Sequence, residues 1–284
     1  MNWQKNSLKK LTSFKIGGKI SRFIEPKDEA ELREILYFCR RHKLKALLIG
    51  AGSNILASER AIKDAVMRLS SAYFSRVKVS NNEIECGAGS PLGKLLNAAK
   101  NHGLSGAEFL AGIPGTVGGA LIMNAGAWGA SIGDLVKDIR VMDYAGKISH
   151  ISRKKAGFIY RNSNLGGFII LSARFRLIRR NKAAVTAKIK KYLENRAKSQ
   201  DNSLPNAGCV FKNPALCSAG MLIDACGLKG KMSGGAVISG KHANFILNAG
   251  RARAADVLRL MRLAQGKVKK RFGVDLEPEI RLWK

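Results

Sequence analysis

Two glycine-rich segments constrain the fold of this 284-residue chain more than any other feature. In the first, residues 47–56, an apolar run leads into a Gly-x-Gly turn whose backbone N–H groups could hold a pyrophosphate. The second, residues 109–133, is rich in glycine and mostly uncharged. Each segment alone is compatible with a tight structural turn, but two in one chain favour close approach of the backbone to a large ligand. A Rossmann loop is disfavoured, since it needs a third glycine and a following helix, whereas residues 54–56 continue as extended chain.

The hydrophobic pattern predicts a mixture of strands and helices around these segments. Asp28, followed by Glu31 three residues on, is expected to cap one helix, and Ser90 before Pro91 is expected to cap another. Strands are predicted at 20–26, 45–49, 83–86, 136–144 and 168–178, the last two separated by a turn at 145–146. Four helices are predicted from their apolar stripes, which are Leu32, Ile35, Leu36 and Cys39; Leu92, Leu95, Leu96 and Ala99; Val185, Ile189, Tyr192 and Leu193; and Val257, Leu260, Met261 and Ala264.

The formal net charge of +30 is unusually high. Much of it lies in the stretches 179–198 and 251–271. Such charge favours nucleic acids, membrane surfaces or small anionic ligands. Both stretches also have helical periodicity, which favours the interpretation that their basic residues form the solvated side of packed helices.

The five cysteines are odd in number and irregularly spaced. This argues against a disulfide framework and against a zinc site, so no metal is expected. The N-terminal residues lack the layout of a signal peptide, and no run approaches the roughly 18 apolar residues of a membrane span. We therefore expect a cytoplasmic protein that does not bind membranes.

Further motifs accompany the two glycine segments along the chain. In order they are Thr12–Gly18 (TSFKIGG), Tyr160–Ser163 (YRNS), Asn206–Pro214 (NAGCVFKNP), Leu222–Gly230 (LIDACGLKG), His242–Phe245 (HANF) and Leu276–Glu279 (LEPE). Taken with the glycine segments, this ordered set resembles the UDP-N-acetylenolpyruvoylglucosamine reductases, also called UDP-N-acetylmuramate dehydrogenases. The short gap between Arg161 and Phe168 resembles the compact subgroup that lacks an extra substrate-covering loop.

The resemblance implies an α+β flavoprotein with a two-part FAD-binding domain of the vanillyl-alcohol-oxidase type and a C-terminal α/β substrate domain. The expected parts are FAD-binding subdomains at 1–70 and 71–178, a substrate domain at 179–273, and a strand at 274–284 that returns to the active site. The residues carried over to FAD are Gly50, Ala51, Gly52, Ser53, Asn54, Ile55, Leu56, Ile113, Pro114, Gly115, Thr116, Gly118, Gly119, Asn124, Ala125, Gly126 and Ala127.

The resemblance also implies the reaction, which belongs to peptidoglycan precursor synthesis. NADPH reduces bound FAD, and the reduced flavin gives hydride to the terminal carbon of an enolpyruvyl ether carried by UDP-N-acetylglucosamine. Negative charge then develops on the substrate carboxylate, which requires a cationic group nearby and an acid that protonates the adjacent carbon.

Three residues are carried over to catalysis. Arg161 is expected to stabilise the developing charge, since a guanidinium can hold a carboxylate with two hydrogen bonds. Glu279 is expected to act at the same carboxylate, where a second carboxyl group must share a proton or polarise the site, which implies a raised pKa. Tyr160, Asn213 and Lys229 are expected substrate contacts. Without the motifs, Arg161 and Glu279 would be interpreted as ordinary surface residues.

Cys209 is the third catalytic candidate and a departure from the family, which usually has serine at this position. A thiol, with a reference pKa of about 8.5, donates a proton far more readily than an alcohol. We therefore expect Cys209 to protonate the substrate carbon and to make the enzyme sensitive to oxidation and alkylation. The alternative is a small apolar side chain that only fills space after Gly208.

Two other functions are compatible with parts of this sequence. Another flavoenzyme of the same cofactor fold, such as an oxidase, would share the glycine segments but would lack Arg161, Cys209 and Glu279 together. A basic nucleic-acid-binding protein would bind DNA or RNA in a salt-dependent way and carry no flavin. We expect no nucleic-acid partner, and we expect a monomer.

Overall fold

The computed structural model describes residues 1–215 and 217–283, and the chain divides into two compact units. Unit 1 consists of Met1–Gln4, Arg22–Ala51 and Lys63–Arg196. Unit 2 consists of Lys5–Ser21, Gly52–Ile62 and the described part of Ala197–Lys284.

Unit 1 contains most of the regular structure. Its strands, the first of which begins in unit 2, are β2 (Lys19–Ile24), β3 (Ala46–Leu48), β5 (Ile62–Met67), β6 (Val77–Ser80), β7 (Glu83–Gly87), β8 (Leu104–Ser105), β9 (Gly126–Ala127), β10 (Ala130–Ser131), β11 (Val136–Asp143), β12 (Ile148–Ser152), β13 (Phe168–Arg176) and β14 (Ile178–Arg179). Its helices are α2 (Glu29–Arg41), α3 (Leu92–Asn101), η1 (Glu108–Leu110), α4 (Val117–Ile122), η2 (Ile132–Asp134), α5 (Arg153–Ala156) and α6 (Lys182–Ser199).

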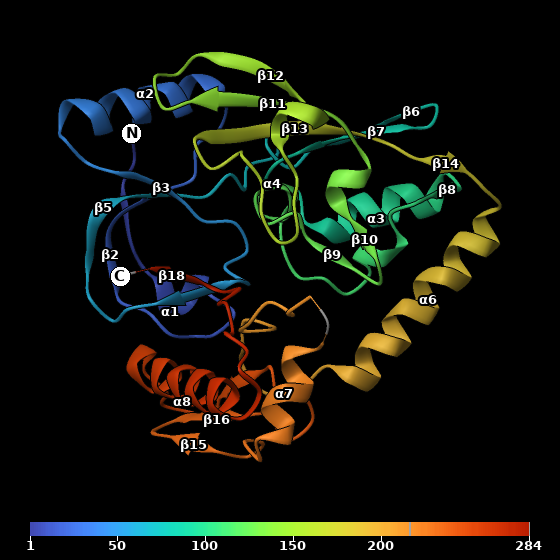
Figure 1. The fold of residues 1–284 in the computed structure, drawn as a ribbon. Helices are drawn as coiled ribbons and strands as arrows, with labels where there is room; N and C mark the ends of the chain where they lie inside the picture. Colours follow the sequence, from blue (N-terminus) through green and yellow to red (C-terminus); the bar gives the residue numbers. More distant parts are fainter. Residues whose placement is uncertain (216, 284) are drawn as a thin grey trace. The chain divides into compact units, whose positions relative to one another are not determined.

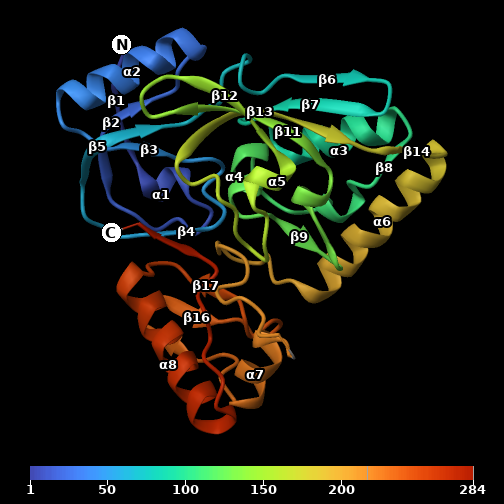
Figure 2. The same ribbon diagram turned by 45° about the horizontal axis from the view of Figure 1, so that its top comes forward.

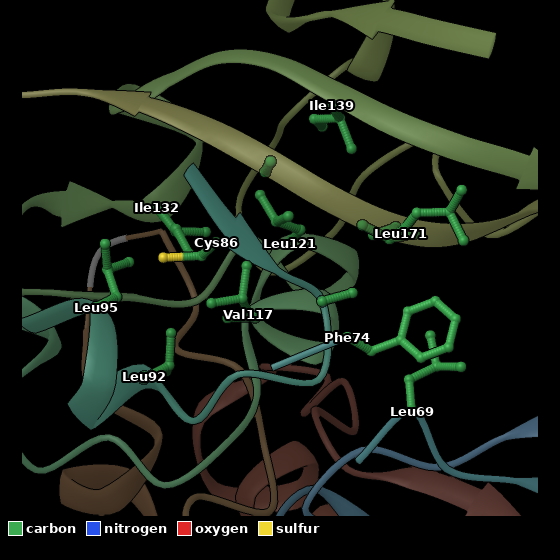
Figure 3. Packing of buried hydrophobic residues seen from close by; sticks show 14 of the residues in the cluster. Leu69, Phe74, Cys86, Leu92, Leu95, Val117, Leu121, Ile132, Ile139 and Leu171 are labelled. Carbon is green, nitrogen blue, oxygen red and sulfur yellow. The ribbon is translucent and has the colours of Figure 1, made fainter. Parts of the chain in front are cut away.

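The larger sheet of unit 1 is antiparallel, with strand order β12-β11-β13-β7-β6, and Figure 1 shows β13 along its middle. The smaller sheet places β3 beside β5 in parallel, with Leu47 opposite Val66. The helices α3 and α4 pack on the larger sheet, and Figure 3 shows Leu92, Leu95, Val117 and Leu121 pointing into the same apolar cluster as Cys86 of β7. This core places the two ends of α4, the helix of the second glycine segment, on a rigid support.

Most of the predicted elements are present. The four predicted strands at 20–26, 45–49, 83–86 and 136–144 correspond to β2, β3, β7 and β11, and the strand at 168–178 corresponds to β13 with the short β14. The predicted turn at 145–146 joins β11 to β12, a strand that the sequence pattern did not predict. The stripes of α2 and α3 are buried throughout.

The predicted cap at Ser90 is wrong. Helix α3 is capped by Pro91 and begins at Leu92, and the Leu92 N–H donates instead to the Gly115 carbonyl at 3.0 Å. Ser90 is fully buried, and its hydroxyl has no hydrogen-bond partner among the residues that the structure describes. The loop before α4 has therefore taken over the role that sequence preference assigned to the serine.

Helix α2 begins as predicted and is tied to the larger sheet by an ion pair. The Asp28 carboxylate accepts from the Glu31 N–H at 3.0 Å, although the Glu31 carboxylate accepts from Lys27 and not from Asp28. Glu29 accepts two hydrogen bonds from the Arg140 guanidinium of β11, one of them at 2.8 Å. The Arg140 hydrogen bond lowers the pKa of the Glu29 carboxyl.

We expect Glu29→Gln to lower the free energy of unfolding at pH 7 by about 1–3 kcal/mol, because it removes a charge-assisted pair whose carboxylate is mostly buried. A carboxyl whose pKa is lowered by folding stabilises the protein above its unfolded pKa, and this contribution is lost as the pH falls through the folded pKa. The difference from the wild type should therefore shrink below about pH 4. Denaturant unfolding at pH 7 and below about pH 4 measures the difference in the free energy of unfolding between the wild type and Glu29→Gln. Glu34→Gln, on the exposed side of α2, is the control. An equal difference at both pH values would contradict the prediction.

The unit boundary near the basic helix differs from the sequence expectation. The predicted boundary lies at residue 179, whereas unit 1 extends to Arg196 and includes most of α6. The reason is packing, because Val185 and Ile189 of α6 are buried in the core cluster of unit 1. Of the other two predicted face residues, Tyr192 is partly buried against this cluster, whereas Leu193 is 46% exposed.

Unit 2 is smaller and is built around its C-terminal helix. Its elements are β1 (Gln4–Ser7), α1 (Leu8–Leu11), β4 (Ile55–Ala57), α7 (Ala219–Ala225), β15 (Met232–Ser233), β16 (Ala236–Ile238), β17 (Ile246–Asn248), α8 (Ala254–Phe272) and β18 (Arg281–Trp283). Helix α8 packs along β15 and β16 (Figures 1 and 2), and its predicted stripe from Val257 to Ala264 is buried. The predicted strand at 274–284 is reduced to β18, which pairs in parallel with β4; residue 284 lies outside the described residues.

No helix within residues 1–215 and 217–283 has both the length and the apolar character needed to cross a membrane.

Candidate functional site

The first glycine turn, residues 50–54, exposes backbone donors as the sequence predicts. It follows β3 and leads into β4. Among the described residues, none accepts a hydrogen bond from the N–H of Gly50, Ala51, Gly52 or Asn54. Gly52 has φ +65°, and a Cβ atom there would lie 2.1 Å from the Leu11 carbonyl oxygen, so only glycine fits. The turn thus combines an obligatory glycine with several unused donors.

The second glycine segment lies next to this turn within unit 1. A Cβ atom on Gly50 would lie 2.7 Å from the Thr116 hydroxyl oxygen, and that hydroxyl caps α4 by accepting from the Gly119 N–H at 3.3 Å. In the part of the chain that the structure describes, the N–H groups of Gly112, Gly115 and Thr116 also find no acceptor. Unit 1 therefore gathers unused backbone donors from two segments far apart in sequence.

These donors fit the cofactor that the sequence implies. A buried or half-buried N–H group without an acceptor is costly, so the donors of Gly50, Gly52, Asn54, Gly115 and Thr116 suit a bound anion that completes their hydrogen bonding. The half-buried Gly115 and Thr116 lie at the start of α4. The residues present suit the diphosphate of a dinucleotide such as FAD.

We expect Gly50→Ala to weaken FAD binding by about tenfold or more, because the new methyl group must displace the Thr116 hydroxyl. Gly93→Ala is the matched control, since a Cβ atom there meets no atom within 4 Å. The measurement is the FAD dissociation constant of the reconstituted apoprotein, with flavin fluorescence as the signal. Equal affinities for the two variants would contradict this placement of the turn.

Residues 124–127, also predicted to bind the cofactor, form internal structure in this chain. Asn124 is 6% exposed. The Ala125 N–H donates to the Ala120 carbonyl at 2.8 Å, and Gly126 and Ala127 form the β9 strand that pairs with β10. A Cβ atom on Gly126 would lie 2.3 Å from the Ala130 carbonyl oxygen. Close packing of this hairpin thus accounts for Gly126.

Arg161 lies at the tip of a tight turn in unit 1. Ile159 and Asn162 exchange backbone hydrogen bonds at 3.1 and 3.2 Å, which leaves Tyr160 and Arg161 as the two central residues. Arg161 has φ +56°, a conformation that turns usually give to glycine or asparagine. Its guanidinium carbon lies 5.1 Å from the centre of the Tyr160 ring, which is 53% exposed. Backbone strain of this kind is concentrated at functional sites.

Cys209 and Glu279 come from neighbouring segments of unit 2. The Glu279 N–H donates to the Val210 carbonyl at 2.9 Å. Because Cys209 directly precedes Val210, Cys209 and Glu279 lie on adjacent segments of the backbone. Cys209 forms an isolated bridge with Phe245 on its other side. Asn244, a residue with no role assigned from sequence, fixes the segment by exchanging hydrogen bonds with the Phe211 backbone at 3.0 and 2.8 Å. The bridge and these hydrogen bonds hold the half-buried Cys209 in an ordered backbone.

Asn54, which belongs to unit 2, is tied to the Glu279 segment of that unit. The Asn54 amide donates to the Glu279 carbonyl at 3.2 Å, and the Arg281 N–H donates to the Asn54 carbonyl at 2.9 Å. The pairing continues as Ile55 and Leu56 of β4 lie beside β18. Unit 2 thus holds Asn54, Cys209 and Glu279 in one hydrogen-bonded assembly.

The predicted substrate contacts in unit 2 already have protein partners. The Asn213 side chain accepts from the Ala219 N–H at 3.0 Å at the start of α7. Lys229 pairs with Asp224 at 2.5 Å. A substrate contact at Lys229 must therefore share or displace this ion pair. No group of His, Cys, Asp or Glu side chains in the described chain is arranged to hold a metal ion.

Two protein-family models match separate parts of the chain. A model described as an FAD binding domain matches residues 20–152. The model of the C-terminal domain of UDP-N-acetylenolpyruvoylglucosamine reductase matches residues 198–283. The two matches follow each other in the order that the sequence motifs predict.

Individual proteins of this name are similar over nearly their full length. Those from Chloroherpeton thalassium and Caldanaerobacter subterraneus are each 40% identical to the chain, over 97% of it and 91% of their own length. The chain also aligns with the crystal structure of the enzyme of this name from Thermus caldophilus over 100% of both chains, with a TM-score of 0.85 and 34% sequence identity. A solvent-stable cholesterol oxidase, 17% identical over 62% of this chain with a TM-score of 0.51, shares the fold alone. The predicted α+β fold with an FAD-binding domain is thereby confirmed.

Proposed function

Because the chain belongs to the UDP-N-acetylenolpyruvoylglucosamine reductase family, it is an FAD-dependent oxidoreductase, and we propose that it reduces the enolpyruvyl ether of UDP-N-acetylglucosamine to UDP-N-acetylmuramate. The structural observation that supports this is the set of unused N–H groups on the two glycine segments, which suits the diphosphate of FAD. The product is a precursor of peptidoglycan.

FAD, when bound, supplies the hydride, and NADPH is the proposed source of that hydride. The hydride adds to the terminal CH2 carbon of the enolpyruvyl group, which becomes a methyl group. The electron pair of the carbon–carbon double bond moves toward the adjacent carbon and its carboxylate. A proton then joins that adjacent carbon, so that the double bond has gained one hydride and one proton.

Arg161 is the residue that we propose to stabilise the carboxylate as charge develops. A guanidinium can donate two parallel hydrogen bonds to a carboxylate, and such donors are most effective when they are held in place before the reaction. The tight turn with φ +56° at Arg161 provides this rigid support. Glu279 is proposed to share a proton at the same carboxylate.

Cys209 is proposed to donate the proton to the substrate carbon from its thiol. The Asn244 hydrogen bonds on one side and the Glu279 segment on the other restrict the backbone around it. Such restriction is what a general acid needs, since proton transfer depends on a short and well-aligned contact. Tyr160, Asn213 and Lys229 are proposed as substrate contacts.

We propose that residues 1–70 and 71–178 act as two FAD-binding subdomains, and that the protein is a cytoplasmic monomer. The basic stretches would attract the UDP diphosphate and the phosphates of NADPH by long-range electrostatics.

Anaerobic flavin absorbance tests the proposed function. NADPH should bleach the bound flavin, and the UDP-linked enolpyruvyl sugar should then restore its absorbance. Bleaching without recovery would indicate a flavoenzyme with another acceptor and would refute the proposed substrate. A protein that takes up no FAD on reconstitution would refute the proposal as a whole.

A further inference from the structure

Asn124 carries more internal hydrogen bonds than a cofactor contact needs. Its Nδ2 donates to the Ile159 carbonyl at 2.9 Å, and its Oδ1 accepts from the Gly133 N–H at 3.0 Å. The residue is 6% exposed and has φ +41°, a conformation that asparagine adopts more readily than most residues. Both polar atoms of the side chain therefore act inside the protein.

The carbonyl that Asn124 holds belongs to the first residue of the Arg161 turn. Ile159 closes this turn with Asn162. On the other side, the Ser163 hydroxyl donates to the Ile122 carbonyl at 3.0 Å. The strained turn is thus fastened at both ends to the last residues of α4 and the residues just after it.

Helix α4 connects this fastening to the second glycine segment. It is capped by Thr116 and contains only the six residues from Val117 to Ile122. The unused N–H groups of Gly115 and Thr116 therefore precede the helix directly, and Asn124 follows it after Met123. Its buried residues Val117 and Leu121 pack in the core that Figure 3 shows. A short helix packed in a core keeps the residues at its two ends at a fixed separation, because core packing resists small displacements.

The same arrangement occurs independently in unit 2. Asn54 of the first glycine turn donates its side-chain N–H to the Glu279 carbonyl at 3.2 Å. Each glycine segment therefore contributes an asparagine whose amide group holds the backbone next to a proposed catalytic side chain.

We infer that Asn124 and Asn54 are positioning residues, which fasten the segments of Arg161 and Glu279 to the two glycine segments. This inference rests on the proposed function of Arg161 and Glu279 and assigns a different role to two residues that sequence alone attributes to cofactor binding. Their side chains set the geometry of the step in which the substrate is reduced.

Asn124→Asp tests the inference in the intact, FAD-loaded protein. Aspartate keeps the acceptor for the Gly133 N–H and tolerates the left-handed backbone, but it has no N–H for the Ile159 carbonyl. Stopped-flow absorbance should show an unchanged rate of flavin reduction by NADPH. Reoxidation by the enolpyruvyl substrate should slow by about tenfold to 10²-fold, the range expected when a reacting group is misplaced. Asn54→Asp should likewise slow reoxidation by the enolpyruvyl substrate, measured in protein saturated with FAD.

Asn248→Asp is the matched control. Asn248 is 5% exposed, donates to the Phe14 carbonyl at 2.9 Å and accepts from the Gly250 N–H at 3.1 Å, but it holds no turn with a proposed catalytic residue. Its substitution should change the two half-reactions equally or not at all. If Asn124→Asp behaves in the same way, or if it releases FAD, the inference is wrong.

Two further variants separate this inference from the proposed function. Ser163→Ala removes the hydrogen bond to the Ile122 carbonyl and should also slow reoxidation selectively. This variant tests the inference if Asn124→Asp does not fold. In an Arg161→Ala background, Asn124→Asp should cause no additional slowing of reoxidation, because the effects of two substitutions that act through the same group are not additive. If Arg161→Ala itself leaves reoxidation unchanged, the proposed role of Arg161 fails. If Arg161→Ala slows reoxidation and Asn124→Asp does not, only the positioning inference fails.

Discussion

Arg161→Gly is expected to lower kcat for the enolpyruvyl substrate by about 10²–10³-fold, the usual loss when a donor to a developing negative charge is removed. Arg161 is the proposed cationic group at the substrate carboxylate, and it occupies a turn position with φ +56°. Glycine accepts this backbone conformation without strain, so the loss of activity should not be accompanied by a loss of stability. The free energy of unfolding should remain equal or rise by about 1 kcal/mol.

The measurement combines steady-state kinetics with denaturant unfolding of the same protein. Arg161→Lys keeps the positive charge but cannot make two parallel hydrogen bonds, so its kcat should fall between those of the wild type and Arg161→Gly. Flavin reduction by NADPH should be unaffected in both variants, because no substrate carboxylate is present in that step. A large fall in stability for Arg161→Gly would mean that the arginine serves the fold, and unchanged reoxidation would remove it from catalysis.

The strained conformation of Arg161 shows how the sequence and the structure complement each other. The Tyr160–Ser163 motif identified the arginine through resemblance, but no local pattern predicts φ +56° for an arginine, since glycine or asparagine is the usual occupant. The strain becomes understandable only when Asn124 and Ser163 are placed around the turn. Both contacts join residues well separated in sequence, which periodicity cannot detect.

The long helices were predictable for a simpler reason. The stripes of α2 and α8 repeat over several turns, so the pattern is strong and burial follows it. The strands β15, β16 and β17 contain two or three residues each and have no measurable alternation. Ser90 has a strong intrinsic preference for a cap, but the Gly115 carbonyl supplies that acceptor from elsewhere in the fold. Local preference therefore fails where a distant segment provides the same hydrogen bond.

The candidate site was predictable from motifs and not from physical pattern alone. The Gly-x-Gly turn indicated backbone donors, and the structure leaves the N–H groups of Gly50 and Gly52 without acceptors among the described residues. The neighbourhood of Cys209 and Glu279 depends on two backbone hydrogen bonds, from the Glu279 N–H to the Val210 carbonyl and from the Lys212 N–H to the Glu277 carbonyl. Such contacts between distant segments follow from the tertiary fold, so only the resemblance could suggest them in advance.

Cys209→Ala is expected to lower kcat by about 10²–10⁴-fold, the usual contribution of a general acid. The proposed role of the thiol is to protonate the substrate carbon after hydride transfer, and alanine cannot donate a proton. Cys209→Ser should retain most of the activity, because serine is the residue that resembling enzymes usually have at this position. Flavin reduction by NADPH should be equal in all three proteins. An alanine variant with full activity would show that Cys209 only fills space.

Alkylation provides an independent measurement of the same role. Burial raises the pKa of the Cys86 thiol to about 12, and burial also raises the pKa of Cys39, so neither should react with iodoacetamide at neutral pH. Cys209, Cys217 and Cys226 are all partly exposed. Iodoacetamide should therefore inactivate the wild type while leaving Cys209→Ser active, although mass spectrometry should find Cys217 or Cys226 modified in both. Inactivation of Cys209→Ser at the wild-type rate would assign the sensitivity to another thiol and leave Cys209 without chemical support.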